Sequence, residues 1–222
     1  MKKLCLLAIS YNEENHIKFW IDNHKEFVDE IILVDTGSTD NTIKIAEENG
    51  IKVFNYQWEH HFAHAKNFAL KCCDAEYHPD WIFFLSPDYW VSKDDMKKIR
   101  AAIEIDTVDA YMTRLMYHHN GWFDLENTTT HGGAITRRGQ IVLYKNDPAI
   151  FYRGKIHESV NISLRDAKKK INYLDITRHH DDASVNKINR EIYFDALLAI
   201  AQKRENYSIP KLDLLRKKLY EK

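Results

Sequence analysis

Three acidic residues stand shortly after apolar segments of this chain, where carboxylates could bind a polar ligand or a cation: Glu13, Asp35 and Asp88. Carboxylate oxygens accept hydrogen bonds from the N–H and O–H groups of bases and sugars, and they are ligands that suit Mg²⁺ and Mn²⁺. If the apolar segments are parallel strands, their carboxyl ends meet at one edge of a sheet, which is where α/β sheets bind ligands. We therefore expect a site at that edge.

The segment Ser10-Tyr11-Asn12-Glu13-Glu14 follows the first apolar run and could hold a nucleobase. Its aromatic ring can stack on a base, and its carbonyl and carboxylate oxygens can accept hydrogen bonds from a base or a ribose. The same residues could instead begin a helix, with Asn12 as the cap and the two glutamates favoured by the helix dipole. From this segment alone, both interpretations stay open.

The segment Asp35-Thr36-Gly37-Ser38-Thr39-Asp40-Asn41-Thr42 combines ligand-binding and helix-capping residues. Asp35 can accept hydrogen bonds from a base or ribose, and Gly37 lets the backbone approach a ligand closely. Ser38 to Asp40 can also cap the next helix, so part of the segment is structural whatever the function. The segment has neither a P-loop lysine nor a G-x-G-x-x-G fingerprint, and the missing fingerprint disfavours a Rossmann oxidoreductase. A nucleotidyltransferase is disfavoured because Ser10–Glu14, near the first strand, has neither a glycine-rich phosphate loop nor a basic residue.

The segment Ser86-Pro87-Asp88-Tyr89 ends the fourth apolar run. An aspartate at a strand end can hold a divalent cation that bridges two phosphates, and oxygen ligands suit Mg²⁺ or Mn²⁺. Asp88 could equally be a turn residue, since aspartate and proline are both common in turns.

Two histidine-containing segments in the second half could supply a base or a metal ligand. In Gly154-Lys155-Ile156-His157-Glu158, an acid beside a histidine could act as a general base. The segment His179-His180-Asp181-Asp182 could ligate a metal. Neither is specific by itself, because such clusters also occur on solvated surfaces.

Apolar runs and helix-forming periodicity alternate along the first half of the chain. The expected strands are Leu4–Ile9, Glu30–Val34, Ile51–Phe54 and Trp81–Leu85. The expected helices are Asn15–Phe27, Thr42–Asn49 (closed by Gly50), Phe62–Cys73 and Lys93–Ile105. This alternation predicts an α/β fold, with a parallel sheet covered by helices on both faces.

The second half is less regular. Ala110–Tyr117 and Gln140–Lys145 are expected strands, separated by the long polar stretch His118–Gly139, whose length suggests a functional loop. Asp195–Lys203 and Lys211–Lys222 are expected amphipathic helices. We therefore expect a main domain over residues 1–184 and a helical tail over residues 185–222 that packs on the domain or extends from it.

The composition is that of a globular protein: 222 residues, 44% hydrophobic, 29% charged, with a net charge of −1. A balanced charge disfavours general nucleic-acid binding. Three cysteines without paired or metal-ligand spacing fit a reducing compartment, so a cytoplasmic location is expected. The apolar start is too short for a signal peptide, and no run is long enough to span a membrane. The lysine-rich last helix is either solvated or a peripheral contact with a membrane or partner.

Together, these segments resemble inverting glycosyltransferases of family 2, which have the GT-A fold. The similarity is strongest to the bacterial branch with lipopolysaccharide-core glucosyltransferases and the peptide S-glycosyltransferases of glycocin clusters. The matching segments, within roughly residues 3–182, are Ser10–Glu14, Val34–Thr42, Trp58 with Phe62–Ala69, Asp80–Leu85 and Gly154–Glu158. The most specific part is Asp35–Thr42 followed at the family's spacing by Phe62–Ala69, and His157-Glu158 points to this branch.

The resemblance implies a nucleotide-sugar donor, by default a UDP-sugar, and a divalent cation, Mn²⁺ or Mg²⁺. The nucleotide-sugar site that it implies comprises Ser10, Tyr11, Asn12, Glu13, Asp35, Lys66 and Ser86. Tyr11, Glu13 and Asp35 would line the base and ribose pocket. Lys66 stands where the family usually has arginine and would reach the nucleotide or its diphosphate.

The resemblance also implies catalytic and metal-binding roles. Asp88 matches the metal-ligating last acid of the family's D-x-D motif, and Glu158 would be the general base that deprotonates the acceptor. His179 lies where a late histidine often completes the metal site, and His180 is an equal rival. If Glu158 is not the base, the alternative bases are Asp181, Asp182 and Asp124.

On charge alone, Arg137 and Arg138 of the long polar stretch could cover the diphosphate. One departure from the family matters more: Ser86-Pro87-Asp88-Tyr89 stands where the family has Asp-Ala-Asp-Glu. Losing carboxylates should weaken divalent binding.

The expected function is sugar transfer with inversion to a glycan or polypeptide acceptor. The alternative is a catalytically impaired nucleotide-sugar or glycan binder on the same fold.

Overall fold

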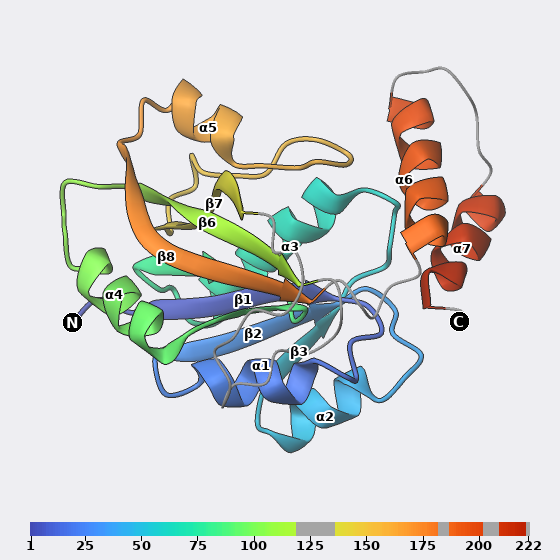
Figure 1. The fold of residues 1–222 in the computed structure, drawn as a ribbon, viewed down its shortest axis with the longest axis horizontal. Coiled ribbons are helices and arrows are strands. Elements are labelled where there is room, and N and C mark those ends of the chain that lie inside the picture. The colour runs from blue at the N-terminus through green and yellow to red at the C-terminus, as the bar shows by residue number, and fades with distance from the viewer. Residues whose placement is uncertain (119–135, 182–186, 202–208, 221–222) are drawn as a thin grey trace.

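The computed structural model describes residues 1–118, 136–181, 187–201 and 209–220 (Figure 1). Its strands are β1 (Leu4–Ser10), β2 (Glu30–Asp35), β3 (Lys52–Asn55), β4 (Trp81–Phe84), β5 (Tyr89–Val91), β6 (Ala110–His118), β7 (Thr136–Lys145) and β8 (Ile171–Asp181). Its helices are α1 (Ile17–His24), α2 (Thr42–Glu48), α3 (Phe62–Glu76), α4 (Lys93–Ile103), α5 (Asn161–Asp166), α6 (Lys187–Ala201), α7 (Ile209–Lys217) and the 3₁₀ helix η1 (Lys218–Tyr220).

The described strands form one sheet in the order β3-β2-β1-β4-β7-β6-β8-β5. The first half is parallel, as the alternation predicted: β1 pairs with both β2 and β4, and β2 pairs with β3. β1 lies in the middle of this half, which explains why its sequence is apolar throughout. Because these strands run the same way, Ser10, Asp35 and the residues after Phe84 lie at one edge.

The second half of the sheet is mixed. β7 runs antiparallel to β4 and β6, while β6 runs parallel to β8. β5 and β8 were not expected from the sequence, and they pair with each other antiparallel. The polar stretch His118–Gly139 was expected to be a loop, but β7 begins at Thr136, so the last residues of that stretch belong to a strand. Residues 119–135 of that stretch lie outside the described part.

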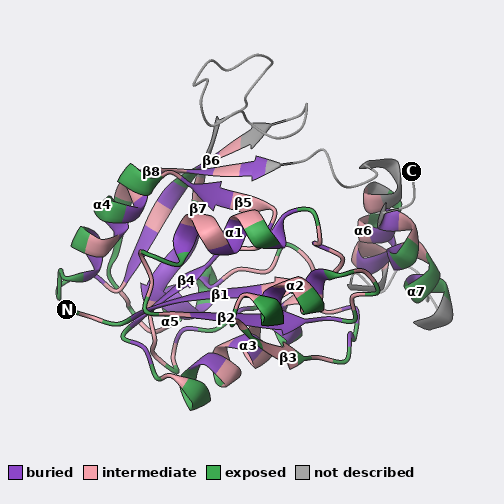
Figure 2. Cartoon of the chain, turned by 90° about the horizontal axis from the view of Figure 1, so that it is seen from below, coloured by how far each residue is buried: buried purple, intermediate pink, exposed green. Residues whose placement is uncertain are grey.

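Helices cover both faces of the sheet, as expected. On one face, α1, α2 and α4 pack through apolar residues such as Trp20, Ala46 and Ile99. On the other, α3 and α5 pack through residues such as Ala69 and Leu164. Figure 2 shows buried residues along the strands and exposed residues on the outer faces of the helices. The site edge therefore rests on a core that is packed from both sides.

The C-terminal helices contact the body of the protein at the carboxyl edge of the sheet. Tyr193 and Leu197 of α6 form a small apolar cluster with Leu212 of α7. Phe62 at the start of α3 packs against this cluster. The indole of Trp58 donates a hydrogen bond to the Tyr193 hydroxyl at 2.9 Å. The described residues of these helices thus contact the start of α3 and the segment after β3.

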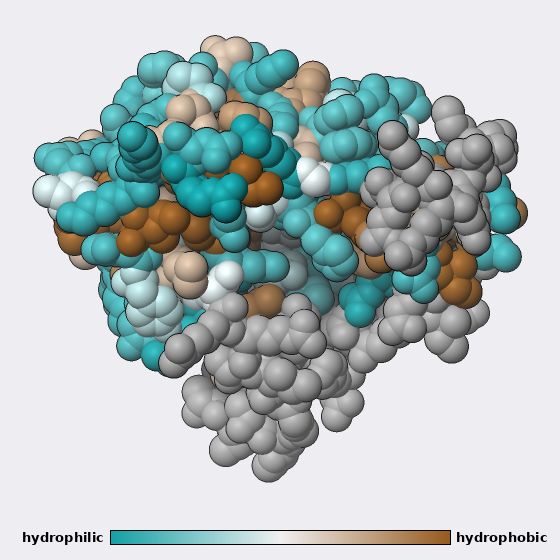
Figure 3. All heavy atoms as spheres, turned by 90° about the horizontal axis from the view of Figure 1, so that it is seen from above, coloured by the Kyte–Doolittle hydropathy of each residue, from teal (hydrophilic) through white to brown (hydrophobic). Residues whose placement is uncertain are grey.

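Among the described residues, no helix combines the length and apolar character that crossing a bilayer requires. The face drawn in Figure 3 is mainly hydrophilic, with hydrophobic atoms in separate areas.

Candidate functional site

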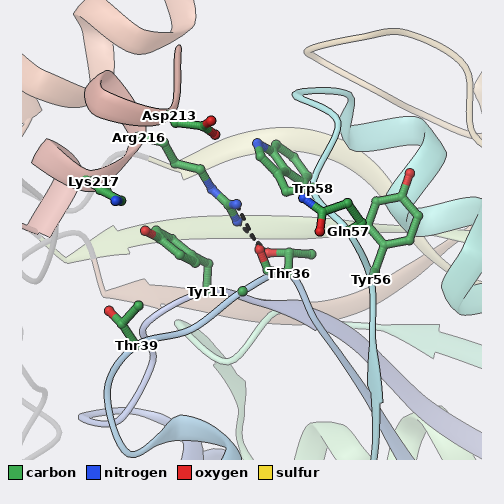
Figure 4. A pocket seen from close by; sticks show the side chains of 10 residues that line it. Tyr11, Thr36, Thr39, Tyr56, Gln57, Trp58, Asp213, Arg216 and Lys217 are labelled. Carbon is green, nitrogen blue, oxygen red and sulfur yellow. Dashed lines mark hydrogen bonds between the residues drawn. The ribbon is translucent and has the colours of Figure 1, made fainter. Parts of the chain in front are cut away.

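A pocket of about 240 Å³ opens at the carboxyl ends of β1 and β2. The residues that line it are Tyr11, Thr36, Gly37, Thr39, Tyr56, Gln57, Trp58, Asp213, Arg216 and Lys217. They come from four parts of the chain: the loop after β1, the loop after β2, the segment after β3, and α7 (Figure 4). This is the edge at which the sequence predicted a site.

Asp35 organises the loop after β2. Its carboxylate accepts hydrogen bonds from the backbone N–H groups of Gly37 at 2.7 Å and Ser38 at 2.8 Å. It also accepts from the hydroxyls of Ser38 and Ser10. Gly37 has a φ of 103°, a conformation that side-chain-bearing residues rarely adopt. Asp35 and Ser10 are therefore both part of a built loop beside the pocket, in addition to any ligand contact.

Tyr11 provides an aromatic wall of the pocket, and its ring is not bare. The Arg216 guanidinium lies 3.7 Å from the centroid of the Tyr11 ring and 4.3 Å from that of Trp58. Arg216 also donates to the carbonyl oxygen of Thr36 at 2.8 Å and to the Thr36 hydroxyl. The expected stacking surface is thus present, with a cation from α7 lying on it.

Glu13 and Asn12 hold the loop after β1. The Asn12 side chain accepts from the N–H of Thr39 at 2.8 Å, and Asn12 itself has a φ of 55°. Glu13 is buried and lies 2.7 Å from the Nδ1 atom of His16. Burial raises the pKa of the Glu13 carboxyl to about 7, against the opposing effect of the His16 hydrogen bond. The negative charge of Asp88 also raises the pKa of Glu13.

Asp88 follows β4 and contacts the end of β8. Its Oδ2 atom lies 2.9 Å from Nε2 of His180, and its Oδ1 atom is buried without a hydrogen-bond partner among the described residues. The His180 ring stacks on Tyr89 with centroids 4.3 Å apart. His179 instead stacks on Trp90 at 4.0 Å. Consecutive strand residues point to opposite faces, so the geometry favours His180 over His179 as the histidine beside Asp88.

Lys66 and Glu158 form a buried ion pair. Nζ of Lys66 lies 2.7 Å from Oε1 of Glu158, and their side chains are 17% and 14% exposed. The ammonium also lies 4.9 Å from the Phe84 ring centroid and 5.0 Å from that of Tyr152. Lys66 was expected at the nucleotide, and here it holds the residue expected to be the base.

A tight turn carries Glu158. Arg153 and Ser159 form an isolated β-bridge on either side of it. Gly154 within the turn has a φ of 107°, and a Cβ there would lie 3.1 Å from the carbonyl oxygen of Ile156. Only glycine fits both conditions. Gly154 therefore has a structural role: it allows the turn that places the Glu158 carboxylate against Lys66.

Some predicted residues cannot be placed. The backbones of Arg137 and Arg138 belong to β7 rather than to a loop, and their side chains lie outside the described residues. Asp124, Asp182 and the side chain of Asp181 also lie outside them. Ser86 follows β4, is partly exposed, and accepts a hydrogen bond through its carbonyl oxygen from the N–H of Tyr89 at 3.0 Å.

Several pocket residues had no predicted role, among them Trp58 and Arg216. Trp58 was part of the family resemblance, and its aromatic type was the available signal for a stacking function. Arg216 lies in a lysine-rich segment, and nothing in its neighbourhood along the sequence distinguishes it from other basic residues of that helix.

This fold and site define an α/β protein of the GT-A, Rossmann-like type, with a ligand pocket at the carboxyl edge of its sheet. A profile of the family described as Glycosyl transferase family 2 matches residues 5–194. The chain therefore belongs to glycosyl transferase family 2.

Curated proteins with similar sequences include several glycosyltransferases. The chain is 35% identical over 122 residues to an uncharacterized glycosyltransferase of Rickettsia felis, covering 54% of this chain and 41% of that protein. It is 26% identical over 155 residues to the SPbeta prophage-derived glycosyltransferase SunS of Bacillus subtilis, covering 68% and 33%. The chain thus spans less than half the length of these relatives.

Solved structures share the fold. The glucosyl-3-phosphoglycerate synthase of Mycobacterium tuberculosis, in complex with Mn²⁺, UDP and glucosyl-3-phosphoglycerate, aligns with a TM-score of 0.61 at 14% identity over 91% of this chain and 80% of that one. TarS of S. aureus in complex with UDP-GlcNAc aligns with a TM-score of 0.59 at 16% identity over 96% and 70%. At these identities the likeness establishes the fold alone.

Proposed function

We propose that the chain transfers a sugar, with inversion, from a UDP-linked donor to a glycan or polypeptide acceptor. The observation that carries the proposal is the set of side chains gathered at one edge of a family 2 fold: a base-sized pocket, Asp88 beside His180, and Glu158 held by Lys66. The donor assignment is supported by UDP and UDP-GlcNAc in the structural relatives.

The residues around Asp88 fit a divalent cation. The buried Oδ1 atom of Asp88 has no partner among the described residues, and a carboxylate oxygen with an imidazole nitrogen is a donor set that Mn²⁺ accepts. Among the described residues no group of three or more acidic, histidine or cysteine side chains could hold a cation, so Asp88 and His180 are the ligands that the proposal assigns to it. When bound, the cation would neutralise charge on the leaving nucleoside diphosphate.

In the proposed reaction the chain's residues bind, orient and move a proton. Tyr11 and Trp58 hold the base, and the Asp35 loop lies beside the ribose. Lys66 fixes the Glu158 carboxylate through Oε1, which leaves Oε2 to take the acceptor proton as the acceptor attacks the anomeric carbon. Much of the rate would come from alignment at the sheet edge.

The test is turnover by Glu158→Gln. A panel of UDP-, GDP- and dTDP-sugars with Mn²⁺ first identifies the donor by slow release of its nucleoside diphosphate. Transfer by Glu158→Gln should then fall by about 10²–10⁴-fold while donor affinity stays unchanged, since the amide can still accept from Lys66. The matched control is Glu76→Gln, the acid of the exposed pair Lys52–Glu76. Near-normal transfer by Glu158→Gln would place the base elsewhere.

One observation favours a second candidate function, a nucleotide-sugar binder without catalysis. Ser86 replaces the acid expected two residues before Asp88, and the site lacks its charge. Donor binding without release of the nucleoside diphosphate, with or without acceptors, would support this alternative. For either function we propose a cytoplasmic protein, and peripheral contact with a membrane stays a proposal for the C-terminal helix.

A further inference from the structure

The pocket at the carboxyl edge of the sheet already holds a planar group that the chain itself supplies. The Arg216 guanidinium lies against the rings of both Tyr11 and Trp58, at 3.7 and 4.3 Å from their centroids. In Figure 4 its side chain reaches from α7 into the space between these two residues. Arg216 is only 8% exposed, so this contact is made in the interior of the site.

The hydrogen bonds of Arg216 are those that a nucleobase edge would make. Its N–H groups donate to the carbonyl oxygen and the hydroxyl of Thr36, the residue directly after β2. A base with a ring N–H, such as uracil, is also planar, stacks on aromatic rings and donates to carbonyl oxygens. The guanidinium therefore uses both kinds of contact that would recognise the base.

The helix that carries Arg216 is fastened beside the pocket by separate contacts. Leu212 of α7 packs on Tyr193 of α6, and the Tyr193 hydroxyl accepts from the Trp58 indole at 2.9 Å. On its other side α7 faces solvent, with Leu214 53% exposed. One side chain thus enters the pocket from a helix that could shift without opening the core of the domain.

We infer that Arg216 stands in for the nucleobase, so that α7 and the nucleotide donor compete for the space between Tyr11 and Trp58. The inference rests on the proposed function, because it takes this space as the base site of the donor. While the guanidinium is in place, a base cannot lie on the same face of Tyr11. The apparent affinity for the donor is reduced by the fraction of molecules in which Arg216 has withdrawn.

The experiment is calorimetric titration of the full chain with UDP and Mn²⁺. Arg216→Ala should bind UDP about tenfold or more tightly than the unaltered chain, because the competing group is gone. Leu214→Ala, an exposed change in the same helix, should leave the affinity unchanged. Titration with pyrophosphate and Mn²⁺ should give equal affinities for all three proteins, since this ligand has no base.

Hydrogen exchange of the unaltered chain provides a readout that needs no variant. UDP should increase amide exchange in α7, because the base displaces Arg216. Decreased exchange in α7, with weaker UDP binding by Arg216→Ala, would overturn the inference and make Arg216 a wall of the site. Equal UDP affinity of the two proteins would overturn it while leaving the donor pocket standing. If neither protein binds UDP, GDP or dTDP, the donor pocket itself is refuted and the competition with it.

Discussion

Replacing Lys66 by methionine should destabilise the protein through the charge that it leaves behind. Lys66 is the ion-pair partner of Glu158, and both side chains are mostly buried. Methionine keeps the length of the apolar stem between Phe84 and Tyr152 but removes the ammonium. The Glu158 carboxylate would then lie in the site without its compensating charge.

The expected cost follows from the burial of the pair. Breaking a buried pair by removing one partner costs about 3–5 kcal/mol. The remaining exposure of 17% and 14% puts Lys66→Met near the lower end, about 3 kcal/mol. The exposed pair Lys52–Glu76 is 53% and 38% exposed, so Lys52→Met should cost less than about 1 kcal/mol.

The pKa of Lys66 determines the pH range in which the ion pair stabilises the protein. Burial alone would lower the pKa of Lys66, but Glu158 and Tyr152 more than offset this and the pKa is raised above 10.5. A raised folded-state pKa means that the contribution of the pair is complete below 10.5 and is lost as the pH rises through the folded-state value. Neutral pH lies inside the stable range. Lys66→Met lacks this group, so its stability deficit relative to the unaltered chain should shrink as the pH rises above 10.5.

Urea unfolding followed by circular dichroism measures these differences at neutral pH and above pH 10.5. The control Lys52→Met separates the buried pair from the general effect of removing a lysine. Equal losses for the two variants, or a deficit in Lys66→Met that does not shrink at alkaline pH, would refute the argument that Lys66 neutralises Glu158.

Three further predictions concern Glu13, Asp88 and Ser86. Because burial raises the pKa of Glu13 to about 7, above its ordinary value of 4.5, the native state binds the extra proton and stability should fall as the pH rises from 4.5 to 7. Glu13→Gln should flatten that fall, by at most about 3 kcal/mol, and an unchanged urea midpoint profile from pH 4.5 to 8 would contradict this. Chelation of divalent ions should weaken UDP binding by the unaltered chain but not by Asp88→Asn, as calorimetry can show. Ser86→Asp should tighten Mn²⁺ binding, and UDP affinity independent of Mn²⁺ in all proteins would refute the metal assignment.

The parallel half of the fold could be predicted because its signals are local. Leu4–Ile9 and Trp81–Leu85 are apolar on both sides, which is typical of strands covered by two layers of helices. β8 gave no such signal, because it begins with exposed residues such as Ile171 and Tyr173 and has polar residues along its length. β5 spans only three residues, and its pairing with β8 is a long-range contact that no local pattern encodes.

The sequence predicted where the candidate site lies, but not which side chains contact one another in it. The position of the acids after the strands follows from topology, so Asp35 and Asp88 lie at the expected edge. The partner of Lys66 could not be predicted, since Glu158 is separated from it by more than ninety residues of sequence. The same holds for Arg216, whose partner Thr36 lies 180 residues earlier.

The irregular pairing of β6 with β8 determines which side chains near the end of β8, His179 and His180 among them, point to which face of the sheet. Between the pairs Met112–Tyr173 and Arg114–Thr177, β6 advances by two residues (112 to 114) and β8 by four (173 to 177). The excess is even, so the inward and outward alternation of side chains continues unchanged beyond the irregularity. Loss of one residue there would exchange the two histidines across the sheet, whereas loss of two would preserve His180 beside Asp88. Whether the number of extra residues in β8 is even or odd, rather than which residues they are, therefore decides which histidine lies beside Asp88.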